Sequence, residues 1–192
     1  MPGHLIVISA PSGSGKTTLA RAIMKSFPSI VFSVSATTRP RRGTEVDGRD
    51  YYFLSREEFE KRIREGRLIE WEEIYGNLYG TLRSEVDRAL ENSLAMLFDV
   101  DIKGALSIKR QYPQAVLIFI RPPGIEALNQ RLRARQTEDE ATLRRRLERV
   151  PLELELGTRC DYQVVNDDLE KAIAEVEHIV MSRTNLEPIH SS

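Results

Sequence analysis

The chain has 192 residues, of which 41% are hydrophobic and 30% are charged, a composition typical of one globular domain with a buried core. Its formal net charge of −1 argues against general binding to nucleic acid or to an anionic membrane, and no apolar run approaches the roughly 20 residues that span a bilayer. The single cysteine, Cys160, excludes internal disulfides, and the three scattered histidines lack metal-ligand spacing. Because no signal-peptide pattern precedes the first apolar segment, we expect a cytoplasmic protein.

The first predicted element is a strand over residues 5–8, followed by a glycine-rich loop and a helix over about residues 16–26. This order is the context of a phosphate-binding P-loop. A simple turn would not require Lys16 and Thr17 directly after a buried strand. Lys16 would reach the β- and γ-phosphates of a nucleotide, and the Thr17 hydroxyl would ligate Mg²⁺. The residues predicted to bind this nucleotide are Ala10, Pro11, Ser12, Gly13, Ser14, Gly15, Lys16, Thr17 and Thr18.

Short elements follow, beginning with a strand over residues 31–34 and a long loop over residues 35–50. A strand over residues 51–54 leads to a helix that begins after Ser55, forms a capping box with Glu58 and buries Phe59. A strand over residues 68–75, a turn at 76–77 and a helix over 82–91 complete this part. These elements interrupt an otherwise alternating α/β pattern, so residues 35–81 are predicted to form a small inserted subdomain that binds a second substrate.

The remaining chain alternates buried strands with helices. The predicted strands cover residues 94–98, 115–120 and 162–165, and the predicted helices cover residues 102–111, 122–135 and 137–156, with a closing amphipathic helix from residue 169. The tail from residue 185 is expected to fray. Five apolar strands alternating with helices predict an α/β fold in three layers with right-handed crossovers.

Two acidic residues, Asp99 and Asp101, directly follow the strand over residues 94–98. An acidic residue at the carboxyl end of a parallel strand, in a chain with a P-loop, occupies the place of the carboxylate that holds the magnesium ion of a bound nucleotide. We therefore predict Asp99 as a second magnesium ligand beside Thr17, either directly or through water.

Seven arginines and no lysine lie between residues 131 and 149. A solvated, salt-bridged helix face and a nucleic-acid patch are the common interpretations of such a cluster. Arginine is, however, the residue best suited to bidentate phosphate contacts, and these arginines flank a turn between two helices, as a closing lid requires. Catalysis of phosphoryl transfer depends mainly on positioning and on cations near the moving charge. We favour a lid, without assigning every arginine to it.

A second group of arginines, Arg39, Arg41 and Arg42, occupies the long loop before Tyr51. Forked guanidinium donors near phenolic hydroxyl groups, those of Tyr51 and Tyr79, have the chemistry of a site for a second phosphate. A kinase with two anionic substrates would need two such groups.

Taken together, these segments resemble the guanylate kinase family, whose members transfer the γ-phosphoryl group of ATP to GMP. The resemblance covers nearly the whole chain, and its most specific segments are residues 32–35, 37–39, 48–51, 69–71, 76–81 and 99–101. It implies a three-layer P-loop kinase fold with a mostly parallel five-stranded sheet (about residues 1–34, 82–130 and 157–184), an α+β GMP-binding subdomain (about 35–81) and a helical lid (about 131–156). It also implies ATP and Mg²⁺, small-molecule substrates, a place in purine nucleotide metabolism, and either a monomer or a small homo-oligomer.

The resemblance also implies roles for individual residues. The residues that should line the guanine pocket are Ser35, Glu70, Thr81 and Asp101. Those that should hold the GMP phosphate are Arg39, Arg42, Tyr51 and Tyr79, and Asp99 should also contact GMP. The lid arginines should be Arg131, Arg135 and Arg146, with Asn166 on the adenine side of ATP. Lys16, Arg42, Arg135 and Arg146 should act on the reacting phosphates.

The guanine assignment also has a physical basis. A carboxylate such as Glu70 accepts from guanine N1–H and N2–H, whereas adenine would leave it buried and unpaired. Two departures from the family pattern stand out: Ala10 replaces the first glycine of the loop, and Pro40 directly follows Arg39. We align Arg42 rather than Arg41 with the second phosphate arginine because Glu45 and Tyr51 then keep their register.

Two other functions are weighed against GMP phosphorylation. A kinase acting on a sugar bisphosphate precursor would share the scaffold, but its substrate has no base edge for Glu70, Ser35 and Thr81 to contact. A non-catalytic peptide-binding module, like the guanylate-kinase-like domains of membrane-associated scaffolds, would have lost the intact phosphate loop that Lys16 and Thr17 complete.

Overall fold

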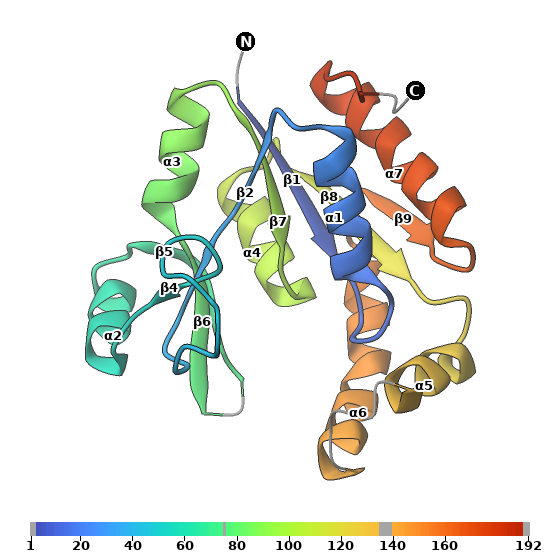
Figure 1. Ribbon diagram of the computed structural model, residues 1–192, viewed down its shortest axis with the longest axis horizontal. Coiled ribbons are helices and arrows are strands. Elements are labelled where there is room, and N and C mark those ends of the chain that lie inside the picture. The colour runs from blue at the N-terminus through green and yellow to red at the C-terminus, as the bar shows by residue number, and fades with distance from the viewer. Residues whose placement is uncertain (1–2, 75, 135–139, 190–192) are drawn as a thin grey trace.

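The computed structural model describes residues 3–74, 76–134 and 140–189. Its central element is a five-stranded, entirely parallel sheet in the order β2-β7-β1-β8-β9 (Figure 1). The strands are β1 (His4–Ser9), β2 (Ile30–Phe32), β7 (Ala95–Asp99), β8 (Val116–Arg121) and β9 (Tyr162–Val165). Strands β1, β7 and β8 are apolar and almost wholly buried, as strands covered on both faces must be. The predicted α/β class and five-stranded sheet are confirmed.

Helices cover both faces of this sheet because alternate side chains of each strand point to opposite sides. Ile6 and Ile8 of β1 pack in one core with α1 (Lys16–Ser26) and α7 (Leu169–Thr184). Leu5 and Val7 pack in a second core with α3 (Arg83–Glu91) and α4 (Ile102–Gln111). The predicted bounds of α1 and α4 agree with the structure.

A second, four-stranded sheet projects beyond the carboxyl ends of the central strands, at the lower left of Figure 1. Its order is β4 (Tyr52–Phe53), β3 (Ser35–Thr37), β6 (Asn77–Leu82) and β5 (Leu68–Ile74), and α2 (Arg56–Arg64) covers it. The Ser55 hydroxyl accepts a 3.1 Å hydrogen bond from the Glu58 backbone N–H, which confirms the predicted start of α2. Phe59 of α2 lies fully buried against Leu78 and Leu82.

Two expectations about local structure were wrong. The segment after residue 35 is not loop from its beginning, because Ser35–Thr37 forms β3, which pairs antiparallel with β6 and parallel with β4. The tail after residue 185 does not fray over its described part. The Ile189 backbone N–H donates to the Ser26 carbonyl (2.8 Å), and Leu186 packs against the core under α7.

Helices α5 (Ile125–Ala134) and α6 (Glu140–Gly157) project beside the same end of the sheet, at the lower right of Figure 1. They pack together through Leu128 and Val150, both buried. The predicted turn between them, with Arg135 and the capping residue Thr137, lies outside the described residues. Within the described chain, no helix combines the length and apolar character needed to cross a membrane.

Candidate active site

The loop between β1 and α1 has the backbone of an anion-binding turn. Gly13 and Gly15 adopt positive φ angles of 89° and 88°, conformations that glycine adopts without strain. Ala10 lies outside that region and is buried in the core beside β1, so its Cβ occupies an ordinary packing position. The alanine that replaces the usual glycine is therefore compatible with the loop.

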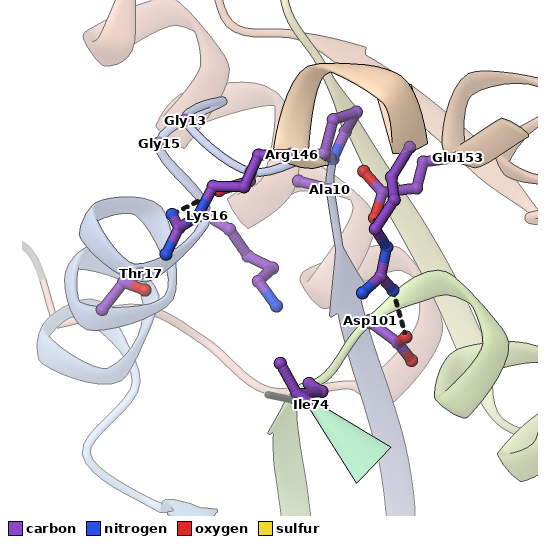
Figure 2. Close-up of a pocket in the computed structure, with 12 residues that line it drawn as sticks. Ala10, Gly13, Gly15, Lys16, Thr17, Ile74, Asp101, Arg146 and Glu153 are labelled. Carbon is purple, nitrogen blue, oxygen red and sulfur yellow. Dashed lines mark hydrogen bonds and ion pairs between the residues drawn. The ribbon is translucent and has the colours of Figure 1, made fainter. Parts of the chain in front are cut away.

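The cation at the start of α1 faces the carboxyl end of β7. Lys16 Nζ lies 2.6 Å from Asp99 Oδ1 and donates to the Val100 carbonyl at 2.9 Å. The neighbouring Thr17 hydroxyl donates to Asp99 Oδ2 at 3.2 Å. Figure 2 shows the Lys16 side chain reaching into the pocket toward Ile74 at the end of β5. The sheet topology thus brings together Lys16, Thr17 and Asp99, as the sequence predicts.

The P-loop is supported from the end of β9. The buried Asn166 side chain donates to the Ser14 carbonyl at 2.7 Å, and its amide nitrogen lies so close to Gly15 that any Cβ there would collide with it. Arg131 on α5 donates to the Asn166 carbonyl at 3.1 Å. Asn166 and Arg131, both predicted on the ATP side, therefore support the loop. Glycine is favoured at position 15 both because a Cβ has no space there and because the backbone has a positive φ angle.

Helix α6 reaches the same loop through Arg146. Its Nη1 donates to the Ser12 hydroxyl at 2.8 Å, across 134 positions of sequence. Arg135, the other arginine predicted to act on the transferred phosphate, lies outside the described residues.

On the second sheet, strand pairing aligns three of the predicted base-contacting residues. Ser35 on β3 pairs with Thr81 on β6, and Thr81 pairs in turn with Glu70 on β5. The Thr81 hydroxyl donates to Glu70 Oε1 at 2.6 Å. Burial raises the pKa of Glu70 to about 7, although the bond from Thr81 favours its ionised form. The fold therefore holds here a carboxylate that is protonated more readily than an exposed glutamate.

A glycine that the sequence interpretation missed brings α4 close to this carboxylate. Asp101 caps α4 by accepting from the Gly104 backbone N–H at 2.8 Å. A Cβ at Gly104 would lie 3.0 Å from Glu70 Oε2 and 3.2 Å from Asp101 Oδ1. The missing side chain lets Glu70 and Asp101 approach one another. A glycine in the first turn of a predicted helix, three residues after a capping aspartate, is the only sequence signal for this arrangement.

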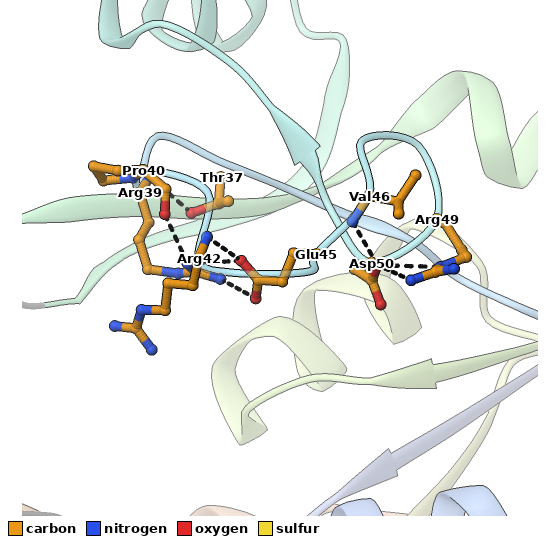
Figure 3. Close-up of polar contacts among 8 residues, drawn as sticks. All are labelled: Thr37, Arg39, Pro40, Arg42, Glu45, Val46, Arg49 and Asp50. Carbon is orange, nitrogen blue, oxygen red and sulfur yellow. Dashed lines mark hydrogen bonds and ion pairs between the residues drawn. The ribbon is translucent and has the colours of Figure 1, made fainter.

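At the position predicted for the phosphate of the second substrate, Arg39 is buried and forms an ion pair with Glu45. Its Nη1 and Nη2 donate to the two Glu45 oxygens at 3.0 and 2.7 Å (Figure 3). The guanidinium also lies 5.3 Å from the centre of the Tyr51 ring, and Tyr51 packs edge-on against Tyr79. Hydrogen bonding from Arg39, helped by the Arg42 backbone N–H, holds the pKa of Glu45 below its usual value.

Arg41 and Arg42 are both exposed. The Arg42 backbone donates to Glu45 at 2.8 Å, while its side chain extends away from that carboxylate in Figure 3. The structure brings Arg39, Tyr51 and Tyr79 together, and Arg41 and Arg42 lie in the exposed loop that follows Arg39.

Two cavities meet at the start of α1. One, of about 260 Å³, lies between the P-loop, Ile74 of β5 and Arg146 of α6. The other, of about 700 Å³, lies between α1 and the second sheet and is lined by Ser35 among others. Lys16 and Thr17 line both cavities. Two anions bound in these cavities would therefore approach each other at a shared cation.

A protein that passes a phosphoryl group between two nucleotides needs two such adjoining sites, and this fold with these cavities defines a phosphotransferase of the P-loop kinase class. Within that class the chain belongs to the guanylate kinase family, whose model matches residues 3–183.

Individual relatives agree with this assignment. The chain is similar to the guanylate kinase of Symbiobacterium thermophilum, with 48% identity over 94% of this chain and 85% of the relative. It is also similar to that of Chlorobaculum tepidum, with 51% identity over 89% of this chain and 88% of the relative. The crystal structure of guanylate kinase from Anaplasma phagocytophilum superposes with a TM-score of 0.73 and 31% identity, over 95% of this chain and 87% of that one.

Proposed function

We propose that the protein catalyses ATP + GMP → ADP + GDP in the cytoplasm, as part of purine nucleotide metabolism. The observation that carries this proposal is the meeting of the two cavities at Lys16 and Thr17. An oxygen of the GMP phosphate attacks the γ-phosphorus in line, and the bond from that phosphorus to the β,γ-bridging oxygen breaks. Catalysis of this step requires positioning and charge stabilisation rather than covalent chemistry by the protein.

On the donor side, the P-loop N–H groups and Lys16 hold the ATP phosphates, and Asn166 and Arg131 support the loop from the adenine side. Thr17 and Asp99 are the residues that would hold Mg²⁺. Their hydroxyl and carboxylate oxygens lie 3.2 Å apart, and Mg²⁺ in kinases is bound by one or two such groups together with substrate phosphates and water. The ion would neutralise charge on the β- and γ-phosphates.

On the acceptor side, Glu70 accepts from guanine N1–H and N2–H, with Ser35, Thr81 and Asp101 completing the contacts to the base. Arg39, Arg42, Tyr51 and Tyr79 hold the phosphate. Support comes from the strand register that aligns Ser35, Thr81 and Glu70 and from the clustering of Arg39 with the two tyrosines. In this proposal residues 35–81 form the GMP-binding subdomain and residues 131–156 form the lid.

The test of this proposal is a panel of nucleoside monophosphates assayed with ATP and Mg²⁺ for release of ADP. GMP should be phosphorylated with a kcat/KM about 10⁴-fold above that of AMP, because adenine has neither the N1–H nor the 2-amine that guanine would donate to Glu70. Comparable rates for AMP and GMP, or no turnover of GMP, would refute the proposed specificity or activity respectively.

A second expectation separates the two neighbouring arginines. Arg42→Ala should raise KM for GMP about 30-fold, the loss of a charge-assisted phosphate contact of roughly 2 kcal/mol, and Arg41→Ala should change KM by less than about threefold. Both residues are exposed, so neither variant is expected to lower thermal stability, which a melting curve checks. The opposite order of effects would assign the phosphate contact to Arg41.

A further inference from the structure

A single guanidinium on α6 lies among three carboxylates. Arg149 Nη2 donates to Glu72 Oε1 at 3.1 Å and lies 3.5 Å from Asp101 Oδ2, while its Nε lies 3.6 Å from Glu153 Oε1. Glu153 is on α6 itself, one turn further on. The other two carboxylates belong to different parts of the fold, Glu72 to β5 of the second sheet and Asp101 to the start of α4 on the central sheet. Arg149 therefore joins three structural units.

The charges around Arg149 make this contact energetically important. Burial and the neighbouring Asp101 raise the pKa of Glu72 to about 7, and burial raises the pKa of Glu153. The other cation near Glu72, Lys103, is largely exposed and 3.9 Å away. Without Arg149, the three converging carboxylates would lose the cation that lies among them. Like charges that are partly buried and unpaired are energetically costly.

The same helix face contacts the donor loop. Arg146 lies three residues before Arg149, one helical turn earlier, and donates to Ser12 of the P-loop. Because Arg146 and Arg149 lie on neighbouring positions of one turn of α6, a position that places Arg146 at the P-loop also places Arg149 at Glu72 and Asp101. Asp101 in turn lies beside Gly104 and close to Glu70, the carboxylate proposed to contact guanine. One turn of α6 thus contacts both the P-loop and Asp101, which the proposed function places beside the base of GMP.

We propose that Arg149 is a positioning residue that couples the two substrate sites by bridging Glu72 on the second sheet and Asp101 beside the base pocket to lid helix α6. The inference rests on the proposed function, since it takes the two sites to be those of ATP and GMP. Occupation of the donor site stabilises α6 against the P-loop, and this places the Arg149 charge where it fixes Asp101 and β5 for the base. By thermodynamic reciprocity, GMP binding favours the same position of α6 and strengthens donor binding.

The coupling is measured as the effect of a non-hydrolysable ATP analogue on GMP affinity, by calorimetry on the full chain. In the parent protein the analogue should tighten GMP binding about tenfold, within the range typical of coupled sites. In Arg149→Ala the analogue should tighten GMP binding by less than about twofold. KM for GMP should rise by about the factor by which this tightening has decreased. Arg149→Lys keeps the charge without the fork and should restore part of the coupling.

The matched control is Arg144→Ala, which removes the same charge from the same helix. The Arg144 side chain is 83% exposed and, within the described residues, pairs with Glu148, which is itself 61% exposed, so coupling and KM should stay at parent values. Glu72→Gln tests the partner from β5. It should weaken coupling, and adding it to Arg149→Ala should cause no further loss, because both changes remove one interaction.

Coupling that survives in Arg149→Ala, or a parent protein with no coupling at all, would overturn the proposal. If Arg149→Ala melts before it can be assayed, the Glu72→Gln and Arg149→Lys measurements decide the same question. If the proposed function is wrong, the parent protein forms no GDP. If only this inference is wrong, the parent protein forms GDP and the substitutions leave the coupling unchanged.

Discussion

Replacing Arg146 with alanine is expected to lower kcat about 10³-fold while KM for GMP changes less than about threefold. Arg146 extends from α6 to the P-loop, where it contacts Ser12 beside the phosphate site. Negative charge on the transferred phosphoryl oxygens is redistributed in the transition state, so a guanidinium there stabilises the transition state more than the bound substrates. Steady-state kinetics with both substrates varied measure the two parameters separately.

The control for this prediction is Arg146→Lys, which retains a positive charge but cannot form a forked contact, and whose kcat should fall between those of the parent and the alanine variant. A rise in KM for GMP with kcat preserved would place Arg146 in substrate binding and remove it from the chemical step. The contrast with Arg149 is informative, because Arg149→Ala is expected to act mainly through GMP affinity although it lies one turn away on the same helix.

The second large effect is expected at Glu70. Glu70→Gln should reduce kcat/KM for GMP about 10³-fold, because the carboxamide presents an N–H donor where guanine also presents donors. The Thr81 hydroxyl, which donates to Glu70 at 2.6 Å, can still donate to the glutamine oxygen, so the fold around the strand pair should persist. Kinetics with GMP and AMP should show a loss of discrimination rather than a uniform loss of activity.

The same substitution should stabilise the unliganded protein at alkaline pH. Since burial raises the pKa of Glu70 from 4.5 to about 7, the folded state binds more protons than the unfolded state between those values. Stability from this group is therefore highest at low pH and is lost as the pH rises through about 7. The advantage of Glu70→Gln in unfolding free energy should grow by about 2 kcal/mol from about pH 5.5 to about pH 8.5.

Denaturant unfolding of both proteins at the two pH values measures this difference. A pH-independent gap would mean that Glu70 titrates with its ordinary pKa. GMP affinity supplies an independent check, because binding of guanine requires the ionised carboxylate. Affinity in the parent should weaken below about pH 7, and in Glu70→Gln this dependence should shrink to the part that belongs to the GMP phosphate itself.

The middle of the central sheet could be predicted from sequence because β1, β7 and β8 are apolar runs whose pattern is local. The P-loop was predictable for the same reason, since Lys16 and Thr17 follow a buried strand directly. Strand β3 was not, because Ser35–Thr37 is short and not strongly apolar, and both strands that pair with it, β4 and β6, lie well beyond it in the sequence. Pairing between distant strands overrides local propensity there.

Charged contacts between residues far apart in the sequence are even harder to predict from local patterns. The pairing of Arg39 with Glu45 spans six residues, and the arginine-rich loop gives some indication of it. The contact between Arg149 and Glu72 spans 77 residues and joins a helix to a strand of another sheet. Nothing in the sequence around either residue indicates the other, because the contact exists only once both sheets and α6 are in place. The resemblance to a family predicted the substrate residues but gave no indication of this one.

The pairing of both principal cations with carboxylates has a consequence for which anions the protein admits. Lys16 contacts Asp99 and Arg39 contacts Glu45, so the cation at each proposed phosphate position already has an internal counterion. A small stray anion such as inorganic phosphate must compete with that carboxylate through one or two contacts alone. A nucleotide brings contacts to its base and several phosphate oxygens at once, which offset the cost of displacing or sharing the counterion. We therefore expect inorganic phosphate to bind either position much more weakly than a nucleotide does.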